Sequence, residues 1–212
     1  MDSSFWLQRW ETNNIGFHRS EANPILVEYF KALSLEKDSR IFVPLCGKTL
    51  DIAWLLSNGY QVAGAELIAM AIEQLFMELK VEPKISDVGE VKHYSATNID
   101  IFVGDIFDVS HKILGPVDAI YDRAALVALP GEMRNRYTAH LIEITDKAPQ
   151  LLVSYEYDQN LMSGPPFSVS NKEVDKHYRE SYDLTLVRSE DVPGRLKGKC
   201  AAKENIWLLK IN

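Results

Sequence analysis

The alternation of short buried β-rich runs with amphipathic helical segments is the feature that most constrains the fold of this sequence. Two β-rich runs, residues 40–44 and 61–66, flank an apolar stretch at residues 50–56 that ends at Asn58-Gly59. A strand, a helix and a second strand in this order form a unit whose two strands run parallel. The sequence therefore predicts a parallel sheet covered by helices.

The rest of the chain continues this alternation. Further β-rich runs lie at residues 100–104, 118–121 and 150–157, and residues 133–144 carry apolar side chains at helical spacing between the last two. The closing runs, 184–188 and 205–211, have no long helical pattern between them, which predicts an antiparallel hairpin at one edge. We therefore expect an α/β fold, a mostly parallel sheet with an antiparallel edge and helices on both faces.

Helix starts can also be read from the sequence. Asn23-Pro24 has the form of an N-cap followed by a first-turn proline, and Ser170 with Glu173 has the form of a capping box. Before the first of these helices, Trp6 and Trp10 lie one helical turn apart. We expect residues 1–23 to form an N-terminal arm, with the two tryptophans serving either as a lid over a ligand or as a packing stripe.

Composition excludes several classes of protein. The 212 residues are 46% hydrophobic, which suits one globular domain over residues 1–212. The net charge of −7 argues against a nucleic-acid partner, and no apolar run is long enough for a membrane span. Two cysteines and five scattered histidines predict no disulfide framework and no metal site. We expect a cytoplasmic protein.

Ligands of open parallel sheets bind beyond the carboxyl ends of the strands, here residues 44–48, Glu66, 105–106 and 122–123. Glu66 ends the second predicted strand, 19 positions after Gly47, where a carboxylate can accept hydrogen bonds from the two hydroxyls of an adenosine ribose. A solvated carboxylate at a strand end is the alternative. We favour the ribose-binding role.

The turn at residues 43–49 limits which ligand that site can take. It ends like a P-loop, but Phe42 stands where the P-loop pattern requires glycine, and the glycine spacing of dinucleotide sites is also missing. This combination suits an adenosine ligand without phosphate, such as S-adenosylmethionine. Cys46, in the same turn, is interpreted as a packing residue rather than a nucleophile because no signature places a base beside it.

Six segments together resemble the thiopurine S-methyltransferase family, and the likeness to its compact bacterial members extends from Trp6 to the end of the chain. The segments are Trp6 and Trp10 with Gly16-Phe17-His18, residues 43–48 (VPLCGK), 64–66 (GAE), 106–108 (IFD), 121–128 (YDRAALVA) and 164–167 (GPPF).

The resemblance implies a class I methyltransferase (Rossmann-like) fold with a seven-stranded sheet. It implies transfer of a methyl group from S-adenosylmethionine to the sulfur of aromatic and heterocyclic thiols such as thiopurines, leaving S-adenosylhomocysteine. By position, the residues expected to contact the cofactor are Trp10, Leu45, Glu66, Ile106 and Arg123, and Phe17 is expected to lie over the acceptor.

The resemblance also suggests catalytic residues. Arg195 is the candidate for a second arginine near the acceptor, and either Arg123 or Arg195 would favour the thiolate by charge. Asp122 is either a base or the partner that orients an arginine.

Three other functions remain open from the sequence. The acceptor could be another small nucleophile, such as a selenium or tellurium oxyanion, because the cofactor residues leave the acceptor open. A non-catalytic adenosine-binding regulator would keep Glu66 but would not need the lid aromatics. The third possibility is a nicotinamide oxidoreductase, which is disfavoured because the phosphate-binding glycines are missing. We expect a monomer acting on a small molecule.

Overall fold

The computed structural model describes residues 3–16 and 18–211. The chain divides into two compact units, Met1–Asp118 and Ala119–Asn212, which are described in turn. The expectation of a single functional domain over residues 1–212 stays a prediction.

The first unit contains a five-stranded sheet with strand order β3-β4-β5-β2-β1. Its strands are β1 (Arg40–Pro44), β2 (Gln61–Glu66), β3 (Lys84–Val88), β4 (Val91–Ala96) and β5 (Ile99–Val103). The central β2 pairs in parallel with β1 and with β5, as the βαβ pattern predicts. β4 pairs antiparallel with β5, and β3 forms the outer edge.

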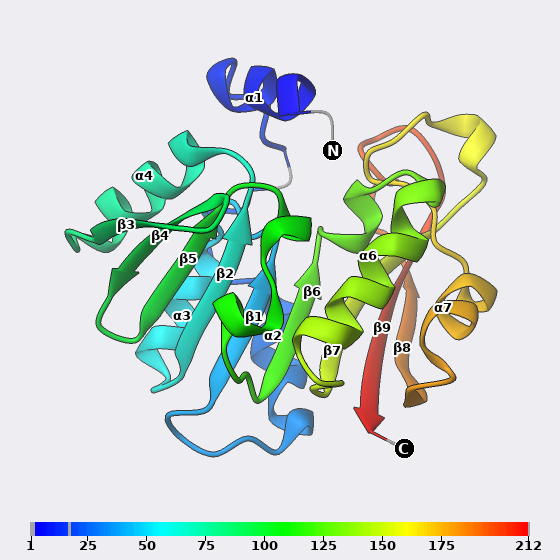
Figure 1. Ribbon diagram of the computed structural model, residues 1–212. Coiled ribbons are helices and arrows are strands. Elements are labelled where there is room, and N and C mark those ends of the chain that lie inside the picture. The colour runs from blue at the N-terminus through cyan, green and yellow to red at the C-terminus, as the bar shows by residue number, and fades with distance from the viewer. Residues whose placement is uncertain (1–2, 17, 212) are drawn as a thin grey trace. The chain divides into compact units, whose positions relative to one another are not determined.

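One helix of the first unit, α2 (Pro24–Tyr29), was predicted from its capping residues, and it begins where they predict. The helices of this unit are α1 (Ser3–Glu11), α2, η1 (Phe30–Leu33), α3 (Leu50–Ser57), α4 (Ala69–Leu79), η2 (Ile106–Asp108) and α5 (His111–Leu114). The Asn23 side chain accepts the N–H of Ile25 (2.9 Å), which confirms the N-cap of α2. Figure 1 draws α3 behind the strands of this unit, the short green α5 in front of them, and α1 beyond the carboxyl end of β2.

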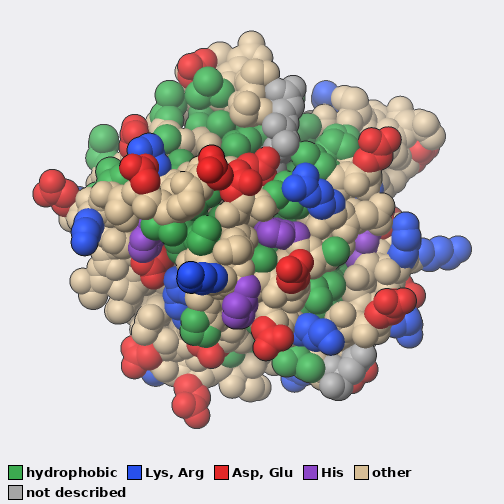
Figure 2. Space-filling view, in the orientation of Figure 1, with side chains coloured by type: hydrophobic (Ala, Val, Ile, Leu, Met, Phe, Trp, Pro, Cys, Tyr) green, Lys and Arg blue, Asp and Glu red, His purple; other side chains and the backbone are tan. Residues whose placement is uncertain are grey.

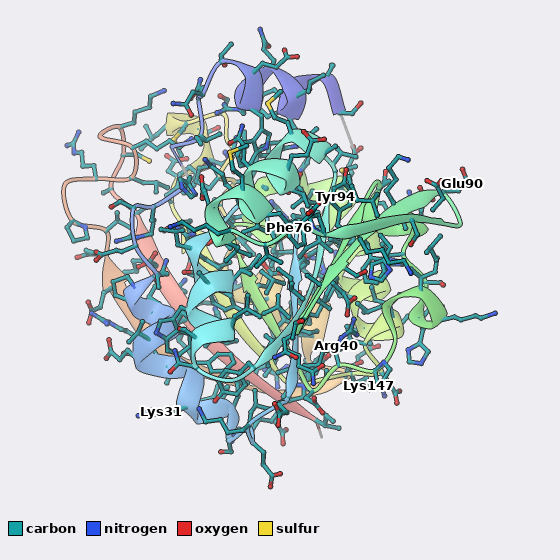
Figure 3. All side chains as sticks on the ribbon, turned by 90° about the vertical axis from the view of Figure 1, so that its left-hand side faces the viewer. Lys31, Arg40, Phe76, Glu90, Tyr94 and Lys147 are labelled. Atoms are coloured by element: carbon teal, nitrogen blue, oxygen red, sulfur yellow. The ribbon has the colours of Figure 1, made fainter. Side chains whose placement is uncertain are left out.

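Helix α4 packs against the sheet through aromatic side chains. The rings of Phe76 on α4 and Tyr94 on β4 lie 6.2 Å apart between centroids and 30° from parallel, and Figure 3 labels both. Tyr94 is buried although its strand was not predicted. The contact therefore fixes the added antiparallel strand to the parallel core.

The second unit contains four strands in the order β6-β7-β9-β8. They are β6 (Ala119–Arg123), β7 (Gln150–Glu156), β8 (Tyr182–Asp191) and β9 (Lys203–Ile211), and the helices are η3 (Leu126–Ala128), α6 (Gly131–Ile144), η4 (Gln159–Leu161) and α7 (Asn171–Tyr178). β6 and β7 are parallel, whereas β9 runs antiparallel to both β7 and β8. The predicted antiparallel edge is confirmed.

The predicted number of strands was wrong. Among the described residues there are five strands in the first unit and four in the second, against the seven expected. The additional pair is the β3–β4 hairpin. Every residue of β3 but one is exposed, so an edge strand of this kind carries no buried alternation from which it could be predicted.

The capping box at the start of α7 was predicted only in part. The Ser170 hydroxyl accepts the N–H of Glu173 (3.2 Å), as expected. The Glu173 carboxylate does not complete the box, because it binds Arg134 on α6 through Nε (2.7 Å) and Nη2 (3.1 Å). This two-point ion pair joins α7 to α6, and Figure 1 shows the two helices side by side.

Charge on the surface is mixed. On the face drawn in Figure 2, Lys and Arg side chains are interspersed with Asp and Glu. None of the helices in the described part of the chain is long and apolar enough to cross a membrane. Among residues 3–16 and 18–211, no cluster of three or more potential metal-ligating side chains occurs.

The close packing of Gly64 against β5 and the turn that follows β1 generates a stability prediction. A Cβ at residue 64 would lie 2.6 Å from Cδ1 of Ile101 and 3.0 Å from Sγ of Cys46. Gly64→Ala is expected to lower the free energy of unfolding by about 1–3 kcal/mol, because the core is overpacked. In a double-mutant cycle measured by denaturant unfolding, Ile101→Val removes the clashing carbon and should recover part of this loss. Strict additivity would contradict the steric explanation.

Candidate functional site

The turn that follows β1, residues 45–48, has an unusual backbone and is called the β1 turn below. Leu45 has φ = 47° and Gly47 has φ = 52°. A left-handed conformation costs a non-glycine residue about 1–2 kcal/mol, so the Leu45 conformation persists only because its surroundings hold it. Strain of this kind collects at functional sites, and the turn was singled out from the sequence as a ligand contact.

The Glu66 carboxylate holds the β1 turn. Its Oε2 accepts the N–H of Gly47 (2.8 Å), and its Oε1 accepts the N–H of Ile68 (2.9 Å). The backbone adds a third link, from the N–H of Cys46 to the carbonyl oxygen of Ala65 (3.0 Å). One side chain at the end of β2 therefore fixes both the turn after β1 and the start of the segment that leads into α4.

The environment of Glu66 differs from that of a solvated carboxylate. Glu66 is 7% exposed, and burial raises the pKa of its carboxyl while the N–H groups of Ile68 and Gly47 oppose that rise. The N–H of Leu67 also approaches this carboxylate. A carboxylate has about four lone-pair positions, so these three N–H groups leave acceptor capacity for a ligand hydroxyl. The geometry thus gives Glu66 a fixed orientation, which the sequence did not reveal.

The Trp10 indole packs directly on the β1 turn. A Cβ at Gly47 would lie 3.1 Å from Cζ2 of Trp10, so the ring occupies the space that a side chain at residue 47 would need. Trp10 is 6% exposed and clusters with Ile68 and Ala71 at the start of α4. The N-terminal arm therefore reaches the carboxyl ends of β1 and β2, and Trp10 belongs to a packed cluster there.

Two other predicted residues of the first unit lie at the same ends of the strands. Ile106 is fully buried in η2, directly after β5, and the Asp105 carboxylate caps this element by accepting the N–H of Phe107 (3.1 Å). Leu45 is half-buried. Cys46 is buried, and burial raises the pKa of its thiol well above the usual range, so the thiol is protonated and a poor nucleophile.

In the second unit, the Asp122 carboxylate holds the turn at the end of β6, residues 123–126, called the β6 turn below. Its Oδ1 accepts a hydrogen bond from the N–H of Leu126 (3.0 Å), and its Oδ2 accepts one from the hydroxyl of Tyr137 on α6 (2.8 Å). Ala124 in this turn has φ = 63°. Each unit thus contains a strained turn after a parallel strand, held by a carboxylate at a strand end.

Asp122 was predicted to be either a base or the partner of an arginine. The structure gives both of its oxygens partners within the second unit, and neither of these partners is an arginine. Asp122 is fully buried, and burial raises the pKa of its carboxyl to about 6. The geometry favours a role in holding the β6 turn, in which Arg123 is the first residue.

For three other predicted site residues, the structure gives a position but no role, or no position. Arg123 is half-buried at the end of β6. Arg195 is exposed, with φ = 71°, in the loop between β8 and β9. Phe17 lies outside the described residues. The roles of Arg123, Arg195 and Phe17 therefore stay predictions.

Tyr137 was missed as a candidate site residue. In the sequence it is one of several apolar side chains on the face of α6, and nothing in that spacing distinguishes a buried ring with a bonded hydroxyl from a plain hydrophobic side chain. Its position facing a strand-end carboxylate follows only from how α6 packs.

The buried Asp122 generates a prediction about pH and stability. Its folded pKa of about 6 is above the unfolded value of about 3.9, so its contribution to stability is present at low pH and lost as pH rises from about 4 to about 6. Asp122→Asn removes this titration and keeps the shape of the side chain. The unfolding free energy of the variant minus that of the wild type should therefore rise across this window, by about 2–3 kcal/mol. Denaturant unfolding at several pH values measures this difference. If the unfolding free energies of the variant and the wild type change in parallel with pH, the raised pKa of Asp122 is wrong.

Comparison of the whole chain with known proteins gives the fold directly. A solved structure of a Burkholderia thailandensis 1,6-didemethyltoxoflavin-N1-methyltransferase, with bound S-adenosylhomocysteine, superposes with a TM-score of 0.66 at 15% identity, covering 99% of this chain and 87% of that chain. TehB from Haemophilus influenzae superposes with a TM-score of 0.60 at 14% identity, covering 88% of this chain and 62% of that one. These likenesses show a class I methyltransferase (Rossmann-like) α/β fold.

Sequence comparison is more specific. The chain is 53% identical over 211 residues to the thiopurine S-methyltransferase of Xanthobacter autotrophicus, covering 99% of each chain. It is 51% identical over 212 residues to that of Teredinibacter turnerae, covering 100% of this chain and 99% of the relative. The sequence profile of the thiopurine S-methyltransferase family matches residues 1–210. The chain therefore belongs to the thiopurine S-methyltransferase family.

Proposed function

We propose that this protein is an S-adenosylmethionine-dependent S-methyltransferase that methylates aromatic and heterocyclic thiols such as thiopurines. The observation that carries the proposal is the Glu66 carboxylate, fixed by the N–H groups of Gly47 and Ile68 at the end of β2. A fixed acceptor at this height suits the two hydroxyls of a ribose. Membership of the family supplies the thiol acceptor.

The residues of the first unit fit an adenosine-bearing cofactor. The β1 turn contains one glycine and no phosphate-binding glycine pattern, and Trp10 covers that glycine. We assign the ribose hydroxyls to Glu66 and apolar contacts with the cofactor to Trp10, Leu45 and Ile106. Burial of these aromatic and aliphatic groups excludes water from the reacting atoms.

When bound, S-adenosylmethionine supplies a methyl group that is already activated by its sulfonium sulfur. The protein therefore needs mainly to hold the acceptor in line and to favour its thiolate form. We assign cofactor contact and stabilisation of the thiolate to Arg123, because a guanidinium remains charged at every working pH. Phe17 is proposed to lie over the acceptor, and Arg195 to add positive charge beside it.

Proton removal requires little of the protein. Aromatic thiols ionise more readily than a cysteine thiol, whose reference pKa is about 8.5. Asp122 already accepts hydrogen bonds from Leu126 and Tyr137, which supports a positioning role rather than direct proton transfer. Asp122 as a base is the alternative, and an already ionised thiol distinguishes the two because it needs no base.

Other functions compete with this proposal at the level of the acceptor. A selenium or tellurium oxyanion would use the same cofactor residues, and a non-catalytic regulator would bind the cofactor without turnover.

We further propose a monomeric, cytoplasmic enzyme organised as one functional domain over residues 1–212, with residues 1–23 as a lid. The small-molecule acceptor leaves no need for a macromolecular partner.

The proposed activity is tested by transfer of labelled methyl groups from S-adenosylmethionine to a panel of acceptors. Thiopurines and other aromatic thiols should be methylated, with selenite and tellurite weaker acceptors. Calorimetry should show micromolar binding of S-adenosylhomocysteine and no competition by NAD, because the β1 turn cannot approach a pyrophosphate. Binding without any turnover would favour a regulator, and equal binding of NAD would contradict the methyltransferase assignment.

The role of Glu66 is tested by Glu66→Gln. This change should weaken S-adenosylhomocysteine binding by roughly 10- to 100-fold, because a hydrogen bond to a charged group contributes about 1.5–3 kcal/mol. It should also lower stability, since the amide cannot accept from both Gly47 and Ile68.

Asp51→Asn is the matched control for that loss of stability. Asp51 is a buried carboxylate that also accepts a backbone N–H, that of Asn23 (2.6 Å), and it is not among the predicted ligand contacts. We expect it to lower the melting temperature without changing cofactor affinity. If Glu66→Gln binds S-adenosylhomocysteine as the wild type does, the ribose assignment is wrong.

A further inference from the structure

The Asp122 carboxylate has one side-chain donor among its described partners. The N–H groups of Leu126 and Ala125 approach it from the β6 turn, and the hydroxyl of Tyr137 approaches it from α6. The backbone donors belong to the turn that the carboxylate holds. Tyr137 is therefore the partner that fixes the carboxylate from outside the turn.

Tyr137 is suited to this task because it is a permanent donor. Its side chain is fully buried, and burial beside Asp122 raises the pKa of its hydroxyl well above the usual range. The phenol is thus neutral and donates whenever Asp122 is ionised. The titratable group that faces this pair from α7 is Tyr178, whose pKa burial also raises well above the usual range, so it adds no charge near neutral pH.

The β6 turn needs such support. Ala124 has φ = 63°, a conformation that costs an alanine about 1–2 kcal/mol. Arg123 immediately precedes Ala124, and its direction is set by the same backbone. A carboxylate free to rotate would give the turn alternative conformations and Arg123 alternative directions.

We propose that Tyr137 is a positioning residue for methyl transfer: its hydroxyl fixes the Asp122 carboxylate, which holds the β6 turn and thereby directs Arg123. This inference rests on the role assigned to Arg123 under the proposed function. It assigns a function to a residue of α6 that touches neither the acceptor nor the cofactor in the proposed arrangement. A buried hydrogen bond that serves stability alone is the competing explanation.

Tyr137→Phe removes only the hydroxyl, and Tyr182→Phe is the matched control. Tyr182 is equally buried, and its hydroxyl donates to the carbonyl oxygen of Ala148 (3.2 Å), so its loss removes a buried phenol bond elsewhere in the same unit. Both variants should lose comparable stability. Only Tyr137→Phe should change the dependence of activity on pH.

The measurement is kcat/KM from about pH 5 to about pH 9 with an aromatic thiol that is ionised throughout, so that the acid limb reports the enzyme. In the wild type this limb should lie near pH 6, the pKa of Asp122. Loss of the Tyr137 donor should move it upward by about one pH unit and lower kcat/KM near pH 6.5 by roughly threefold, with recovery near pH 8.5. Superposition of the Tyr137→Phe and Tyr182→Phe profiles would overturn the inference.

Two further variants keep the test decisive. Asp122→Asn should remove the acid limb and lower kcat/KM even for the ionised thiol, a loss that a base role does not predict. A retained limb in this variant would overturn the inference even if Tyr137→Phe does not fold. The two proposals are separated by the wild type and by Arg123→Gln. A wild type that methylates no thiol contradicts the proposed function. Normal methylation by Arg123→Gln, or its inactivity together with an unchanged Tyr137→Phe profile, contradicts only the inference.

Discussion

The hydrogen bonds that the Glu66 carboxylate accepts from Gly47 and Ile68 are the interaction on which the first unit's candidate site depends. Without them, the turn that contains the left-handed Leu45 would keep the backbone link from Cys46 to Ala65 but lose both side-chain links, and the surface on which Trp10 packs would be less firmly held. The same carboxylate is proposed to receive the cofactor ribose. One buried acidic side chain thus joins local backbone strain and docking of the arm to the proposed recognition of the ligand.

In the second unit a carboxylate also holds a turn, but its burial lowers the stability of the folded state. Asp122 is ionised near neutral pH although it is fully buried, so the folded state carries an unfavourable charge in return for a fixed β6 turn. Under the role proposed for this turn, stability is traded against function, as enzymes show at their sites. It also explains why an acidic residue, rather than a neutral one of the same shape, suits position 122.

Periodicity in the sequence was enough to predict the parallel strands, the helices between them and the antiparallel edge, because these elements bury regular apolar faces. The exposed strand β3 lacks such a face and was missed. Strand ends predicted where Glu66 and Asp122 would lie. Their hydrogen-bond partners could not be predicted, because Gly47 and Tyr137 reach them through turn conformation and helix packing, which a linear pattern does not encode.

The contact between Trp10 and Gly47 has a consequence for how the chain can vary. A Cβ at residue 47 would press on the indole at 3.1 Å, so a larger residue there requires the ring to shift, and it would also have to adopt a left-handed backbone (φ = 52°). A substitution at one of the two positions, which are 37 residues apart in the chain, therefore limits which residues fit at the other. Relatives that keep the arm in this place should covary at these positions, and a designer who wishes to widen the site has to change both.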